Sequence, residues 1–116
     1  MDEIILVKEP IKLERLKELA SERFGDLVKA VVDVKLEIMS IGGKMHADEE
    51  SLLLEDGSNQ DDLWGINIYP DSPKEQWIEF DSMINIRPRQ NNRSRGVEDL
   101  ELQNKIIKIV DSLVLI

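Results

Sequence analysis

The sequence predicts an α+β domain, with a mixed or antiparallel sheet of about five strands and three helices arranged in two layers. Short apolar runs rich in Ile and Val alternate along the chain with segments of helical period. Consecutive strand-like runs are joined mostly by short turns, which favours hairpins. The length of 116 residues is the usual size of one compact domain. We therefore expect a single compact domain over residues 1–116, with the element order β-α-β-β-α-β-β-α.

The first two predicted elements are a strand and a helix. Residues 3–7 (EIILV) form a continuous apolar run that ends before Glu9 and Pro10, as a buried strand does. Beyond them, apolar residues recur at helical spacing, at Leu13, Leu16, Ala20 and Phe24. Gly25 follows, where a helix commonly ends.

A hairpin and a second helix are expected next. Residues 27–43 contain too many Val and Ile residues to prefer a helix, and the charged residues near their middle predict two strands joined by a turn at 33–36. Residues 46–57 (HADEESLLLEDG) place acids where the first turn of a helix would be, and this favours a helix that stops at Gly57.

The last three predicted elements are two strands and a helix. Residues 64–69 alternate apolar and polar side chains, as a half-buried strand does. Residues 77–86 alternate again, which predicts an antiparallel hairpin of the two segments. The side chains expected inside are those of Ile78, Phe80, Ile84 and Ile86, and those expected on the other side include Trp77 and Asn85. Asp99 is the expected N-cap of a final helix, whose apolar stripe continues to Val114.

Composition excludes several classes of protein. The net charge of −9 disfavours wide contact with double-stranded nucleic acid, because such contact needs Lys and Arg to neutralise many phosphates. There is no cysteine, and His46 is the only histidine, so disulfides, thiol catalysis and the usual zinc sites are excluded. The first apolar run is too short for a signal peptide or a membrane span. We expect a cytoplasmic protein with no membrane contact, no bound metal and no cofactor.

Four of the six arginines lie within residues 85–95 (NIRPRQNNRSR), although the chain is acidic. Guanidinium groups match phosphate and carboxylate oxygens, and Asn and Ser add neutral donors. We therefore expect this arginine loop to lie open and to bind an anion, with the ligand-binding candidates Asn85, Arg87, Arg89, Asn92, Arg93, Ser94 and Arg95. The alternative is that the arginines pair with carboxylates of this chain. Residues 48–62 contain seven carboxylates and no Lys or Arg, and they could supply the carboxylates for such pairs.

A second hypothesis is an enzyme. His46 follows a double glycine and precedes several acids, while Glu79 and Asp81 lie two residues apart on a predicted strand, so both would leave the same face. With the loop arginines, these three candidate catalytic residues suit a metal-assisted phosphoester hydrolase or a nuclease-like enzyme. The alternative is structural. His46 would then start a helix, and the two carboxylates would pair with basic side chains across the sheet.

Five strings occur in one order along the chain: GDLVKAVVDV, IGGKMHADEE, DLWGINIYP, WIEFDSMINIRP and NRSRGVED. Together they resemble a prokaryotic family, domain of unknown function 5674, over nearly the whole length. The resemblance implies a small cytoplasmic domain and adds no activity. The expected function is thus that of a binding or regulatory module. Its loop at 87–95 would grip a phosphate-bearing or carboxylate small ligand, an acidic partner protein or the acidic segment of a second copy.

Overall fold

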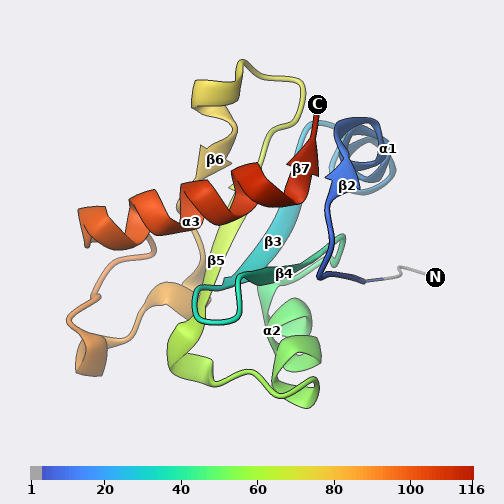
Figure 1. The fold of residues 1–116 in the computed structure, drawn as a ribbon. Coiled ribbons are helices and arrows are strands. Elements are labelled where there is room, and N and C mark those ends of the chain that lie inside the picture. The colour runs from blue at the N-terminus through green and yellow to red at the C-terminus, as the bar shows by residue number, and fades with distance from the viewer. Residues whose placement is uncertain (1–3) are drawn as a thin grey trace.

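A five-stranded sheet forms the centre of the fold, with the strand order β1-β4-β3-β5-β6 (Figure 1). The structure is a computed structural model and describes residues 4–116. The strands are β1 (Ile5–Val7), β3 (Val28–Asp33), β4 (Ile38–Ile41), β5 (Leu63–Ile68) and β6 (Ile78–Glu79). Every pairing in this sheet is antiparallel. The predicted α+β class is confirmed.

Three helices lie at the predicted places among residues 4–116. They are α1 (Leu13–Arg23), α2 (His46–Glu55) and α3 (Leu100–Leu113). Asp99 caps α3 as expected, since its side chain accepts a hydrogen bond from the Glu101 amide at 2.9 Å. Gly25 ends α1 with a φ of +93°, a backbone conformation that glycine adopts without steric cost.

The predicted hairpin between β3 and β4 is also confirmed. Its turn is stabilised by Asp33, which is fully buried and whose Oδ1 accepts hydrogen bonds from the amides of Lys35 and Leu36, both at 2.9 Å. The other carboxylate oxygen accepts a hydrogen bond from the Ser58 hydroxyl at 2.6 Å. The turn is thereby joined to the segment that follows α2.

The helices cover both faces of the sheet, so the expectation of two layers is wrong. Side chains of α1 and α3, such as Leu16 and Ile106, pack on one face with Ala30. Figure 1 shows α3 crossing in front of β3 and β5. Leu53 of α2 packs with Val31 on the opposite face. Neighbouring residues of β3 point to opposite faces, and because Ala30 on one face and Val31 on the other are both fully buried, each face has its own cover.

A small second sheet was not predicted. It pairs β2 (Ile11–Lys12) with β7 (Val114–Leu115) in parallel, at the start of α1 and the end of α3. Of the first predicted strand, residue 3 lies outside the described residues, and β1 is only partly buried. The segment predicted as half-buried, β5, is buried along its whole length, because sheet neighbours and packed elements cover both of its faces.

The predicted strand at 77–86 is wrong beyond Glu79. Two short 3-10 helices follow β6, η3 (Met83–Asn85) and η4 (Pro88–Gln90). Trp77 and Asn85, expected to face away from the core, are buried, whereas Ile86, expected inside, is exposed.

The reason is a side chain that replaces strand pairing. The amide group of Asn85 accepts a hydrogen bond from the Gly65 N–H at 2.8 Å and donates one to the Gly65 carbonyl at 2.9 Å. One side chain thus satisfies both backbone groups of β5 that a continuing strand would have paired.

Candidate functional site

Arg87, the first arginine of the predicted ligand loop, points into the protein. Only 7% of it is exposed, and its Nη2 donates a hydrogen bond to the Leu63 carbonyl at 2.6 Å. Its Nη1 donates to the Gln60 carbonyl, and the guanidinium lies 4.2 Å from the centre of the Trp64 ring. Burial lowers the pKa of Arg87. The expectation that all four guanidiniums lie open is therefore wrong for this one.

The asparagines of the loop are also directed inward. Asn85 and Asn92 are buried, and the side-chain amide of Asn92 donates to the carbonyls of Asn85 at 2.7 Å and Gly96 at 2.8 Å. Its oxygen accepts a hydrogen bond from the Glu98 amide at 2.9 Å. The hydroxyl of Ser94 accepts from the Gly96 amide at 3.2 Å. These predicted ligand-binding residues bind the loop's own backbone.

The other arginines lie at the surface. Arg89 pairs with Asp61 at 2.5 Å, and Arg95 pairs through Nε with Asp81 at 2.6 Å. The hydrogen bond from Arg89 lowers the pKa of Asp61. Within residues 4–116, the guanidinium of Arg93 makes no hydrogen bond or ion pair. The alternative of internal pairing thus holds for Arg89 and for the Nε of Arg95.

A cavity of about 260 Å³ opens beside Arg95, between the start of α2 and η3. We call it the basic pocket, and it is lined by Lys29, Lys44, Met45, His46, Ala47, Ser82, Met83, Ile84 and Arg95. Three of these side chains are cationic and none is a carboxylate. Among the predicted residues, the pocket brings His46 and Arg95 together.

His46 is held in a defined tautomer at the wall of this pocket. Its Nε2 lies 2.7 Å from the Ile66 carbonyl, and since a carbonyl only accepts, Nε2 carries the proton. Nδ1 is then unprotonated, and it makes no hydrogen bond within the described part of the chain. Burial lowers the pKa of His46, and the positive charges of Lys29 and Arg95 lower it further. The hydrogen bond to Ile66 and the negative charge of Asp81 raise this pKa, but they do not outweigh the lowering. The imidazole is therefore a neutral acceptor near neutral pH.

The close approach of His46 to the sheet depends on Gly65. A Cβ built there would lie 3.2 Å from Cδ2 of His46 and 2.5 Å from Oγ of Ser82. Only a glycine leaves room for both side chains. Ser82 is buried, and its Oγ accepts a hydrogen bond from the Ile84 amide at 3.3 Å, so its hydroxyl proton remains to be donated.

The two predicted catalytic carboxylates are engaged elsewhere. Because β6 ends at Glu79, the premise that Glu79 and Asp81 leave one strand face is wrong. Glu79 accepts hydrogen bonds from the Asn67 amide at 2.9 Å and the Tyr69 hydroxyl at 3.1 Å, while Asp81 holds Arg95. Among residues 4–116, no group of three or more His, Cys, Asp or Glu side chains is arranged to hold a metal ion.

A buried carboxyl group lies further along α2. Glu49 is fully buried, its Oε2 accepts a hydrogen bond from the Gly43 amide at 2.9 Å, and its Oε1 has no partner in the part that the structure describes. Burial raises the pKa of Glu49 well above its ordinary value. The folded state therefore holds this proton more tightly than the unfolded chain does.

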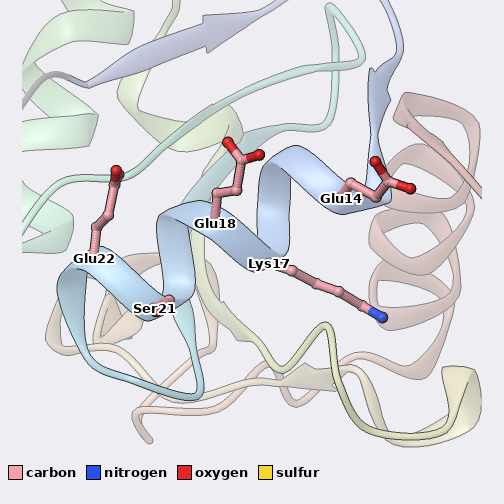
Figure 2. A pocket seen from close by; sticks show the side chains of 5 residues that line it. All are labelled: Glu14, Lys17, Glu18, Ser21 and Glu22. Carbon is pink, nitrogen blue, oxygen red and sulfur yellow. The ribbon is translucent and has the colours of Figure 1, made fainter.

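A larger hollow of about 590 Å³ lies along α1 and is less suited to a ligand. All of its lining residues belong to that single helix. Figure 2 shows the side chains of Glu14, Glu18 and Glu22 on one side of α1, with Lys17 extending away from them. A row of acids on one helix face is well hydrated, so the basic pocket is the better candidate.

Several residues of the basic pocket were missed by sequence reasoning. Lys29, Ser82 and Met83 carry no motif, and their segments are far apart in the sequence. The double glycine before His46 is the one local signal, and it lies just before the start of α2.

The model of one protein family, described as a protein of unknown function (DUF5674), matches residues 5–113. Comparisons with curated proteins and with solved structures give no match. No helix among residues 4–116 is long and apolar enough to cross a membrane.

Proposed function

We propose that this chain, which belongs to the DUF5674 family of proteins of unknown function, is a small binding or regulatory module that holds an anionic ligand in the basic pocket. The observation that carries this proposal is the lining itself. Among the residues of 4–116 that line the cavity, three side chains are cationic, one is His46 and none is a carboxylate, in a chain whose net charge is −9. Such a local reversal of charge attracts and orients an anion.

The donors of the pocket suit a phosphate or a carboxylate. Arg95 uses its Nε for Asp81, which leaves the two terminal nitrogens of the guanidinium for a ligand. Lys29, whose ammonium lies 5.3 Å from the centre of the Phe24 ring, adds a charge on a flexible stem. Ser82 adds a hydroxyl.

The start of α2 adds a further attraction. His46 and Ala47, its first two residues, both line the pocket. Amide groups in the first turn of a helix carry a partial positive charge and have no partner within the helix. The unprotonated Nδ1 of His46 can accept a hydrogen bond from a protonated ligand oxygen.

The arginine loop contributes mainly through Arg95. The carbonyl of Arg95 accepts hydrogen bonds from the Ser82 amide and from the Asn85 side chain, both at 2.9 Å. These bonds fix the backbone of Arg95 beside η3. Arg87 and Asn92 thus support the loop, and Arg95 is the arginine that lines the pocket.

Titration of the protein with inorganic phosphate, sulfate and small carboxylates tests this proposal. We expect Lys29→Gln and Arg95→Gln to weaken binding about tenfold each, the usual size of one lost charge-assisted contact. Arg93→Gln is the matched control, because it removes the same charge from the same loop outside the pocket lining.

Two results would overturn the proposal. One is the absence of binding by any of these anions. The other is an equal loss of affinity in Arg93→Gln and Arg95→Gln. Such a result would indicate that anions are attracted by the overall positive charge of the loop and not bound in the pocket.

Metal-assisted phosphoester hydrolysis, the second sequence hypothesis, gains no specific support. Glu79 is bound by Asn67 and Tyr69, and Asp81 by Arg95. We do not propose it.

A further inference from the structure

The lining of the basic pocket has two chemically different halves. One half is polar and consists of Lys29, Lys44, His46, Ser82 and Arg95. The other half is apolar and consists of Met45, Ala47, Met83 and Ile84. The apolar half comes from two elements, the residues at the start of α2 and those of η3.

Two methionines at this pocket are unusually exposed. Met45 is 58% exposed and Met83 is 64% exposed. A single exposed apolar side chain is common on a protein surface, but two that line one cavity with Ile84 form a local apolar surface.

The backbones below these side chains are fixed. The Met45 carbonyl accepts the amide of Asp48 at 3.2 Å, and the Met83 carbonyl accepts that of Ile86 at 3.2 Å. The thioether side chains themselves are flexible and adapt to the shape of an apolar partner. The pocket therefore combines a fixed polar wall with an adaptable apolar one.

The volume limits what can be enclosed. A cavity of about 260 Å³ is smaller than the roughly 300–1,000 Å³ of sites that enclose a whole drug-sized ligand. An anionic head group fits among the basic side chains, and the rest of such a ligand would extend outward over the methionines.

Resting on the function proposed above, we propose that the ligand of the basic pocket is a dissolved small molecule in which a phosphate or carboxylate is joined to an apolar group. The apolar group lies on Met45, Met83 and Ile84, and the anionic group lies among Lys29, Arg95 and His46. A membrane lipid is disfavoured as the source, because the net charge of −9 repels an anionic bilayer.

Monoalkyl phosphates of increasing chain length are the appropriate probes. Complete burial of one methylene group tightens binding about fourfold, so three partly buried methylenes should tighten it about tenfold. We expect butyl phosphate to bind about tenfold tighter than methyl phosphate by isothermal titration calorimetry.

Met83→Gln and Met45→Gln test the apolar half. Each should reduce the ratio of the affinity for butyl phosphate to the affinity for methyl phosphate. Leu100→Gln is the control, because Leu100 is 71% exposed and does not line the pocket. It should preserve both affinities.

The outcomes separate this inference from the proposed function. Equal affinities for methyl and butyl phosphate would refute the inference that the ligand carries an apolar group, and would leave the proposed anion site intact. No binding of either compound would refute both proposals. An equal loss of methyl and butyl phosphate binding in Met83→Gln would mean that the methionine only supports the pocket. Binding to phosphatidic acid vesicles without binding to the dissolved compounds would contradict a dissolved ligand.

Discussion

Substitution of Arg87 gives the sharpest test of the structure, because the sequence had suggested that this side chain binds a ligand. In Arg87→Met, an apolar stem still covers Trp64, but the hydrogen bonds to the carbonyls of Gln60 and Leu63 are lost. Hydrogen bonds from a charged donor contribute about 1.5–3 kcal/mol each, which sets an upper limit of about 6 kcal/mol for the two. Gln60 is exposed, so water can replace one of them. We therefore expect a loss of about 3 kcal/mol in the free energy of unfolding.

Urea denaturation followed by tryptophan fluorescence measures this loss directly. For a chain of this length, about 3 kcal/mol corresponds to a fall of about 12 °C in Tm. Arg87→Lys keeps the charge but not the planar fork, and should lose about 2 kcal/mol. Arg93→Met is the matched control and should change stability by less than about 0.5 kcal/mol. If Arg87→Met lowers the free energy of unfolding no more than this control does, the buried position of Arg87 is wrong and the loop is open.

Three further predictions concern the sheet face below α2. Gly65→Ala should cost about 1–3 kcal/mol in urea denaturation, because the new Cβ would lie 2.5 Å from Oγ of Ser82, and adding Ser82→Gly should restore part of the loss. The raised pKa of Glu49 means that the folded state holds this proton more tightly. Its contribution is therefore complete below pH 4.5 and is lost as pH rises through the folded pKa, by at most about 1.4 kcal/mol per pH unit, and Glu49→Gln should abolish that slope. Sulfate, which does not titrate in this range, should bind more tightly as the pH falls from about 7.5 through the lowered pKa of His46, because protonation adds a positive charge to the imidazole, and calorimetry of His46→Gln should show no such change. A sulfate affinity that is independent of pH in the native protein would place His46 outside the binding site.

The helices and the central hairpin could be predicted because each has a repeating local signal. The apolar period of α1 and the glycine after it define an element that hardly depends on distant residues. The strands β2 and β7 have two residues each, too few for any period, and they form only because α1 and α3 bring them together. The second half of the predicted strand at 77–86 failed for a different reason. Its alternation was real, but the Asn85 side chain made the bonds that the backbone was expected to make.

The candidate site could be predicted only in part. An excess of arginines in an acidic chain drew attention to residues 85–95, and the double glycine drew attention to His46. Neither signal could show that Arg95 and His46 line one pocket, because this depends on the return of the loop to η3 through the carbonyl of Arg95. Lys29 lies on β3 and carries no local signal at all.

The contrast between Arg87 and Arg95 shows why counting charges cannot locate a site. Both belong to the same loop, yet the direction of each guanidinium depends on which acceptors the fold places within reach. Arg87 meets the Leu63 carbonyl at the start of β5 and the Gln60 carbonyl just before it, where the Trp64 ring shields the guanidinium from water. Arg95 meets one carboxylate, which occupies only its Nε. The desolvation of Arg87 is offset by both hydrogen bonds and the ring contact, so releasing it to a ligand would leave the Leu63 carbonyl without this donor. Arg95 can reach a ligand without breaking any hydrogen bond, and the anion site is therefore expected at Arg95 and not at Arg87.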